Sequence, residues 1–487
     1  MKQKLINKNP RWNAVTFWGI VVFLVLIVMT GCTPAEPVET ETPTSTPTET
    51  AVPTQTATPL PEFIPTPTEP VTSGVETDDL DGRVVKFAHP WVGEAAQVLE
   101  GIAEDFSSTN PWGIRVEVDS HGGETALRGA LQADLDAGQM PGLIAVHPYV
   151  LSGLEGNFSL VDLGSFIDDP EWGFDPDSLA DIDPVFIEPF TFDDGIIALP
   201  FAPQATVLFY NSTWGQELGH SEPPRDQNAF REQSFDAAFV NWRDDNPESD
   251  GKGGWKINLD PAVLASWYFA FDGIIPNEGI PSFNNEAGLD TFSYLRDLRI
   301  ETSIWFPTQP EPYDDFVKRH ALLYAGQLDD VPIQMNWMEA SDSADEWEVL
   351  GFPGVDGELI VVDGPGLLIT GGLIEDELAA WLFAKHLLEP EVQVELVQSM
   401  FTLPVRISAY DLLEDFLEAY PQWVQGADLL DSARALPVSH GWGVAQWVLQ
   451  DAGFRLLFSP DPNQPDQVSL ILEMLDEMIL DMAEASP

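Results

Sequence analysis

The chain has 487 residues, more than one ordinary hydrophobic core needs and enough for two lobes. It carries 21 Lys and Arg against 80 Asp and Glu, a formal net charge of −59. This acidity disfavours nucleic acid as a partner and docking on anionic lipid, since both need a basic face. A hydrophobic content of 44% excludes a wholly disordered chain. A single cysteine excludes an internal disulfide framework and any multi-cysteine metal site.

Residues 1–31 have the composition of an export signal, with a basic start and an uncharged apolar stretch up to residue 31. The basic residues are Lys2, Lys4, Lys8 and Arg11. Small residues then precede Cys32, as in a bacterial lipobox, whose cysteine is lipidated and becomes the mature N-terminus. We therefore expect an extracytoplasmic body that a lipid on Cys32 anchors to the bacterial cell membrane. An uncleaved anchor helix is the alternative.

Residues 32–74 are expected to form a disordered tether. From residue 33 to 74 the chain has 13 Thr and 10 Pro in 42 residues, and no Lys or Arg. Such a segment buries too little apolar surface to offset its chain entropy. In polyproline geometry, at about 3.1 Å per residue, it could reach on the order of 100 Å. It is either a stalk, which could be O-glycosylated, or a neutral spacer.

The body begins with alternating strand and helix patterns. Strands are predicted at residues 83–88, 114–118 and 143–146, and helices with apolar residues at helical spacing at 94–106 and 125–137. This order implies a largely parallel sheet covered by helices. In such sheets ligands bind beyond the carboxyl ends of the strands, where residues 89–91 and 147–149 follow the first and third strand.

Two extended apolar segments predict crossings between sheets. Residues 195–211 are interrupted by Pro200 and Pro203, and residues 360–370 are interrupted by Pro365. Each is expected to leave one sheet and enter another. Further helices are predicted between and after these crossings, at residues 261–271, 289–299, 375–388, 390–401 and 468–482.

Three segments carry a resemblance to a known family. They read GIIALPFAPQATVLFYNSTW, EWEVLGFPGVDGELIVVDGPGLLITGG and DELAAWLFAKHLLEPEVQVELVQSMFTLPVRISAY. Their order and spacing are similar to the hinges and helix pair of family 1 extracellular solute-binding proteins, the receptors of bacterial ABC sugar importers. The chain departs from the family pattern at residues 219–240 and at 272–274. Ligand specificity is therefore expected to have drifted.

The resemblance implies an α/β fold of the periplasmic-binding-protein type (type II). It has two lobes, each a mixed sheet flanked by helices, joined by two or three hinge crossovers. Lobe 1 is expected to comprise residues 75–202 plus about 367–408, and lobe 2 residues 203–366 plus about 409–487. The resemblance implies that a solute, a mono- or oligosaccharide, binds between the lobes and that lobe closure presents it to membrane permease subunits. The resemblance implies a monomer and no cofactor, catalytic residue or metal.

Sugar receptors use aromatic rings for the apolar faces of a sugar and polar groups for its hydroxyls. Several aromatic or polar residues of the body stand near strand ends, crossovers or helix starts that the resemblance places at the cleft. The candidate ligand-binding residues are Trp91, His147, Tyr149, Gln204, Tyr210, Trp267, Tyr268, Gly366, Arg406 and Trp442. The competing interpretation is core packing for the aromatic residues, a hydrogen-bonded loop residue for His147, solvent exposure on the hinge for Gln204 and a permitted bend for Gly366. For Arg406 a structural ion pair is favoured.

Enzymatic interpretations lack a motif. The chain has no G-x-S-x-G, H-E-x-x-H or phosphate-binding loop, and its 80 acids single out no catalytic pair. Two alternatives to the transport receptor stay open: a secreted lipoprotein that hydrolyses glycans, and a structural or adhesive surface lipoprotein without a ligand.

Overall fold

The computed structural model describes Thr72 and residues 74–193, 195–306, 311–458, 464 and 466–485. All of them belong to the second of two chain units, which spans residues 64–487. The predicted export signal, Cys32 and nearly all of the tether lie outside the described residues. Among the described residues, no helix combines the length and apolarity needed to span a bilayer.

The first sheet contains the strands predicted at the start of the body. Its order is β2-β1-β3-β15-β6, with β1 parallel to β2 and β3, and β15 antiparallel to β3 and β6. The strands are β1 (Val84–His89), β2 (Arg115–Ser120), β3 (Leu143–Val146), β6 (Leu199–Pro200) and β15 (Gly366–Ile369). The predicted strand and helix order is confirmed, because apolar residues with the expected spacing fill the core beneath this sheet.

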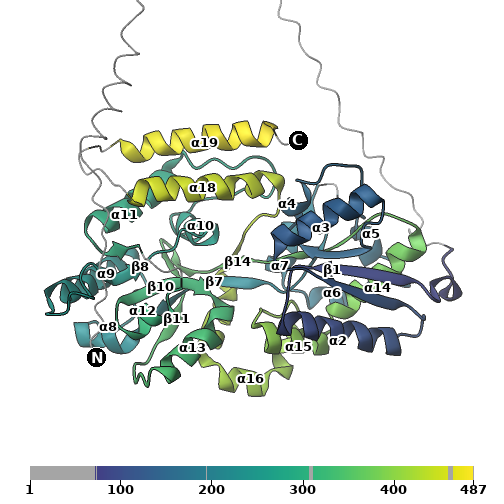
Figure 1. Cartoon of the computed structure of the whole chain (residues 1–487), viewed down its shortest axis with the longest axis horizontal. Helices are drawn as coiled ribbons and strands as arrows, with labels where there is room; N and C mark the ends of the chain where they lie inside the picture. Colours follow the sequence, from purple (N-terminus) through teal and green to yellow (C-terminus); the bar gives the residue numbers. More distant parts are fainter. Residues whose placement is uncertain are drawn as a thin grey trace, which may run out of the picture. The chain divides into compact units, whose positions relative to one another are not determined.

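Helices pack around this first sheet (Figure 1). The longer ones are α2 (Glu94–Thr109), α3 (Glu124–Ala137), α14 (Ile374–Leu387) and α15 (Pro390–Met400). The shorter ones are α4 (Pro148–Leu151), α5 (Gly164–Ile167), α6 (Pro176–Ala180) and α7 (Pro184–Ile187). A small hairpin joins β4 (Thr191–Phe192) to β5 (Gly195–Ile196). Trp381 of α14 is fully buried and donates its indole N–H to the Trp172 carbonyl at 2.9 Å, which fixes α14 in the core.

The second sheet has seven strands in the order β16-β14-β7-β10-β8-β9, with β11 paired to β7. Its strands are β7 (Gln204–Tyr210), β8 (Gly253–Lys256), β9 (Ile304–Trp305), β10 (Ala321–Gln327), β11 (Glu348–Leu350), β14 (Val361–Asp363) and β16 (Arg434–Ala435). A hairpin of β12 (Phe352–Gly354) and β13 (Gly357–Leu359) adjoins it. The central strand β7 is buried along nearly its whole length, which explains its continuous apolar sequence.

Helices also flank this second sheet (Figure 1). They are α8 (Ser212–Leu218), α9 (Gln227–Arg243), α10 (Pro261–Ala270), α11 (Glu286–Ile300), α12 (Tyr313–Val317), α13 (Val331–Ala340), α16 (Glu414–Ala419), α17 (Pro421–Ala427), α18 (His440–Phe458) and α19 (Gln467–Ala485). The predicted late helices are present, and α18 and α19 pack on each other and on α11. Nine of the ten residues of α10 are buried, so this helix is enclosed on all sides.

Three chain segments connect the two sheets. The first runs from β6 to β7 and the second from β14 to β15, as the two proline-interrupted segments predict. A third passes residues 402–408, where Leu403 N–H donates to the Pro203 carbonyl at 2.8 Å and Arg406 bridges to Ile182. The structure therefore has two sheets with helices around each, joined by three connections. The lobe boundaries given above remain a prediction.

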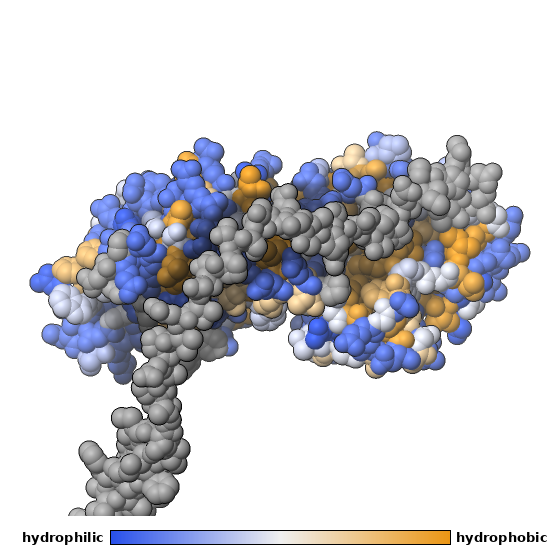
Figure 2. Space-filling view, turned by 90° about the horizontal axis from the view of Figure 1, so that it is seen from above, coloured by the Kyte–Doolittle hydropathy of each residue, from blue (hydrophilic) through white to orange (hydrophobic). Residues whose placement is uncertain are grey.

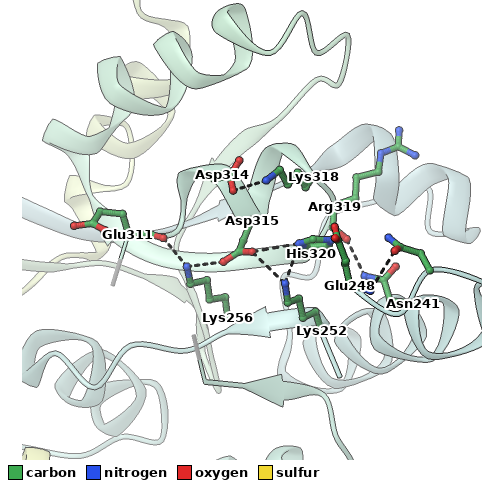
Figure 3. A network of polar contacts seen from close by, with 11 residues as sticks. Asn241, Glu248, Lys252, Lys256, Glu311, Asp314, Asp315, Lys318, Arg319 and His320 are labelled. Carbon is green, nitrogen blue, oxygen red and sulfur yellow. Dashed lines mark hydrogen bonds and ion pairs between the residues drawn. The ribbon is translucent and has the colours of Figure 1, made fainter. Parts of the chain in front are cut away.

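Several basic residues of the second lobe belong to a network of ion pairs and hydrogen bonds (Figure 3). Lys256 is 3% exposed, and its ammonium group donates to Asp315 at 2.9 Å and to the Glu311 carbonyl at 2.6 Å. Burial favours the neutral form of Asp315, but the bonds from Lys256 and His320 hold the pKa of this carboxyl below its usual value. Lys318, by contrast, is exposed and pairs with Asp314 across one helical turn at 2.7 Å.

We predict that Lys256→Met lowers the free energy of unfolding by about 2–4 kcal/mol, because it leaves the half-buried Asp315 without its main partner. The matched variant Lys318→Met removes an exposed pair and should cost less than about 1 kcal/mol. Urea unfolding followed by tryptophan fluorescence measures both. Equal losses for the two variants would contradict the role assigned to the buried pair.

Candidate functional site

A cavity of about 320 Å³ lies where the two lobes and their three connections meet. Trp91 and His147 come from the first lobe, and Gln327 and Asp329 from the second. The complete lining is Trp91, Ala95, His147, Ala202, Gln204, Gln327, Asp329, Asp363, Gly364, Pro365, Met400 and Thr402. An apolar cavity of about 20 Å³ adjoins the same crossovers and is too small for a solute. We call the 320 Å³ cavity the cleft.

The first-lobe side of the cleft lies at the carboxyl ends of parallel strands. Trp91 follows β1 and His147 follows β3, so neighbouring strand ends bring the two side chains to one edge of the sheet. The Trp91 ring packs edge-on against Phe201, with ring centroids 5.6 Å apart, and remains partly exposed. A well-supported aromatic face therefore borders the cavity.

His147 connects the first lobe to the second crossover. Its Nδ1 lies 2.7 Å from the Glu124 carboxylate on α3, and its Nε2 lies 3.2 Å from the Asp363 carboxylate at the end of β14. Burial opposes the charged imidazolium, but these two carboxylates outweigh burial and raise the pKa of His147 to about 10. The imidazolium thus joins the lobes by an ion pair that stays charged at neutral pH.

Tyr149 lies beside the cleft and not in it. Its ring stacks on His147 with centroids 5.2 Å apart, and it packs so closely on Gly443 that a Cβ there would lie 2.6 Å from the Tyr149 Cβ. Burial and the nearby Asp363 and Glu124 raise the pKa of its hydroxyl. Tyr149 lines a second, open groove of about 600 Å³ next to His440. Its role in the structure is to seat α4 on α18.

The second-lobe side of the cleft is polar and acidic. Gln204 begins β7, and its Oε1 atom is buried with no hydrogen-bond partner among the described residues. Asp329 lies in the short 3-10 helix Leu328–Asp330 that follows β10, and its side chain is accessible to solvent in the cleft. Burial by surrounding protein and the adjacent Asp330 raise the pKa of Asp329 to about 7. The neighbouring Asp330 accepts hydrogen bonds from Tyr313 and from the Gln327 N–H.

The structure does not bring the remaining candidates to the cleft. Trp267 is fully buried among Phe230, Trp255 and Phe352, because α10 is enclosed by the second-lobe core. Tyr268 and Trp442 belong to the same core, at 1% exposure each. These aromatic residues therefore stabilise the second lobe by core packing, which was the alternative interpretation of the sequence.

Tyr210, Gly366 and Arg406 likewise have structural contacts. Tyr210 is buried and donates its hydroxyl hydrogen to Gln233 at 2.8 Å. Gly366 opens β15, where a Cβ would lie 2.5 Å from that of Ala198, so glycine permits the close packing of the strands.

Arg406 is 4% exposed and sits inside the first lobe. It donates to the Leu388 carbonyl at 2.7 Å and to the Ser178 carbonyl, and its guanidinium lies 5.0 Å from the centre of the Phe174 ring. Burial lowers the pKa of this guanidinium. The favoured structural role is thus observed, with carbonyl groups and an aromatic ring as its partners in place of a carboxylate.

Sequence reasoning missed several polar lining residues, among them Gln327, Asp329 and Asp363. Gln327 ends β10, Asp329 lies in the short helix that follows, and Asp363 ends β14. Strand ends were a usable signal, as they were for Trp91 and His147. Acidic residues are so abundant in this chain that their type alone gave no reason to select these two.

We predict that His147→Gln destabilises the protein by about 2–4 kcal/mol near pH 6.5, because two carboxylates then lose their shared partner. The pKa of His147 rises from 6.5 to about 10 on folding, so its stabilising effect is complete below pH 6.5 and is lost as the pH rises toward 10. The difference in unfolding free energy between wild type and variant should therefore shrink over that interval. A difference in unfolding free energy that does not depend on pH would contradict this account. The control is His220→Gln, which removes an imidazole from the pair with Asp236.

We predict that Trp267→Ala lowers the unfolding free energy by about 3–5 kcal/mol, since it empties a fully enclosed site in the second-lobe core. Thermal and urea unfolding measure the effect. A variant with unchanged stability but altered solute binding would show instead that Trp267 faces a ligand.

Comparisons with known proteins agree with this architecture. A family model described as bacterial extracellular solute-binding protein matches residues 101–425. A cyclic alpha-maltosyl-1,6-maltose binding protein from Arthrobacter globiformis shares 16% identity, with 82% of this chain and 99% of that protein covered and a TM-score of 0.68. The sugar-binding protein MalE from Xanthomonas citri shares 18% identity, with 82% of this chain and 98% of that protein covered and a TM-score of 0.66. UgpB from Mycobacterium tuberculosis, whose structure was solved in complex with glycerophosphocholine, shares 17% identity, with 82% of this chain and 99% of that protein covered and a TM-score of 0.62.

No curated protein sequence matches the chain. The structural likenesses, all at low identity, show a common fold, and they confirm the predicted two-lobed α/β class of the periplasmic-binding-protein type. The family match covers most of the body, including all three connections. The chain therefore belongs to the bacterial extracellular solute-binding protein family.

Proposed function

We propose that this protein is the receptor of an ABC importer that binds a carbohydrate in the cleft and delivers it to membrane permease subunits. The observation that carries the proposal is the cleft itself, because both lobes and all three connections contribute to one cavity. Two of the structural neighbours described above are named for binding a maltose-derived sugar or for sugar binding in general. The neighbours' names support a sugar ligand, and the lining residues are compatible with one.

The lining offers the two kinds of contact that a sugar needs. Trp91 presents a partly exposed ring for the C–H face of a pyranose, and Gln204, Gln327 and Asp329 offer polar groups for its hydroxyls. A volume of about 320 Å³ suits a mono- or disaccharide. Lobe movement about the three connections would open and close the cavity.

The remaining features of the proposal concern the cellular setting. Lipidation at Cys32 and the Thr- and Pro-rich segment would tether a monomeric body outside the cytoplasm. The protein would bind its solute without cofactor and without chemical turnover, as a receptor for transport requires. A glycan hydrolase would instead convert its substrate.

We predict that Trp91→Ala weakens carbohydrate binding at least about tenfold with little loss of stability, because the ring borders the cleft and is not enclosed by the core. The measurement is a thermal-shift screen of mono- and oligosaccharides, followed by isothermal titration of each binder against wild type and variant. Trp242→Ala is the matched control, since Trp242 is 66% exposed on α9 and does not line the cleft.

Three results would contradict the proposal. They are release of products from a bound glycan, equal effects of Trp91→Ala and Trp242→Ala on binding, and the absence of any carbohydrate that binds.

A further inference from the structure

The polar lining of the cleft is rich in hydrogen-bond acceptors and poor in cations. Two carboxylates, Asp329 and Asp363, border it, and none of its lining residues is Lys or Arg. Its single basic side chain is His147, whose two ring nitrogens are already engaged by Glu124 and Asp363. A solute that enters the cleft therefore meets negative charge that no lysine or arginine in the lining offsets.

Asp329 is the acid that a solute can reach. Its side chain is accessible in the cleft and has no hydrogen-bond or ion-pair partner from another described residue. The other acids nearby are engaged, since Asp363 accepts from His147 and the Gly364 N–H, and Asp330 accepts from Tyr313. Asp329 is thus placed to accept from a donor that the solute supplies.

Three basic residues of the body that are wholly or partly buried bind other groups. Arg406 is buried in the first lobe against backbone carbonyls, and Lys256 is buried against Asp315 (Figure 3). Arg319 pairs with Glu217 at 2.6 Å and with Asp345 at 2.7 Å. The fold therefore leaves the Asp329 carboxyl group without a basic partner among the described residues, at the edge of a cavity large enough for a solute. A cation brought by the solute would favour the ionised form of this carboxyl group.

Two further groups favour a cationic nitrogen. The buried Gln204 Oε1 atom borders the same cavity as an acceptor without a donor. The partly exposed Trp91 ring offers a face to which a cation is attracted. Among the described residues, no three His, Cys, Asp or Glu side chains group as a metal site, so an organic cation fits better than a metal ion.

We propose that the cleft selects a solute that carries a protonated amine, with Asp329 as the residue that recognises the charge and Trp91 and Gln204 as its neighbours. The inference rests on the proposed function and names the solute class for the same site. Anionic solutes would be rejected, because they would place a negative charge against Asp329 and Asp363 with no cation in the lining.

The test compares sugars with the same ring skeleton and different charge. Isothermal titration at neutral pH and low salt would use cellobiose, the glucosamine disaccharide, its N-acetylated form and glucuronic acid. We expect the amine-bearing disaccharide to bind at least about tenfold more tightly than cellobiose, and glucuronic acid not to bind. Asp329→Asn should weaken binding of the amine-bearing disaccharide at least about tenfold more than binding of cellobiose, which would remove most of the preference.

Asp356→Asn is the matched control, because it removes one carboxylate from an exposed turn of the second lobe that does not line the cleft. This variant should keep the preference for the amine. Equal binding of cellobiose and the amine-bearing disaccharide would overturn the inference and leave the proposed function intact. Equal effects of Asp329→Asn and Asp356→Asn would also overturn it. Failure of all four sugars to bind would count against both this inference and the proposed function.

Discussion

The close contact of three chain segments between the lobes is the constraint on which the rest of this structure depends. The Phe201 N–H donates to the Pro365 carbonyl at 3.0 Å, and the Leu403 N–H donates to the Pro203 carbonyl at 2.8 Å. At Gly364 a Cβ would lie 2.8 Å from the Pro203 Cα, so the first two segments approach closely only because this residue has no side chain. This junction forms one wall of the cleft and fixes where the two lobes can face each other.

The strand ends of the first lobe and the end of β10 in the second lobe supply the other walls. His147 adds an ion pair across the junction, and α4 packs on α18 beyond it. The lobes therefore meet on two sides of the cavity, one at the connections and one at Tyr149. A solute enclosed in this way contacts both lobes at once, which is how a receptor couples binding to the relative position of its lobes.

The distribution of charge gives the sequence composition a physical meaning. Hydrophilic residues cover most of the visible surface at the left of Figure 2, over the second lobe, in keeping with the excess of acids. Basic residues such as the buried Lys256 and the partly exposed Arg319 pair with acids and help to hold the lobe together. The cleft is acidic because the chain has many acidic residues and its few Lys and Arg side chains make structural contacts elsewhere.

The sequence was sufficient to predict three strands of the first sheet, their helices, several later helices and two connections, because strand and helix periods are local and Pro200, Pro203 and Pro365 mark the breaks. Most strands of the second sheet were not predicted. It also placed Trp91, His147 and Gln204 at the cleft, since they follow or begin strands that meet there. It failed for Trp267, Tyr268 and Trp442, because an aromatic residue on a helix looks the same in sequence whether it faces a core or a ligand. Asp329 was missed because its isolation from every cation is a property of the folded chain alone.

The most direct test of this account is a crystal structure of the protein with a carbohydrate that it binds. The account predicts electron density for the sugar in the cleft, in contact with Trp91 and Asp329 and with groups from both lobes. A sugar bound in the groove beside Tyr149, or against Trp267 or Trp442, would contradict it.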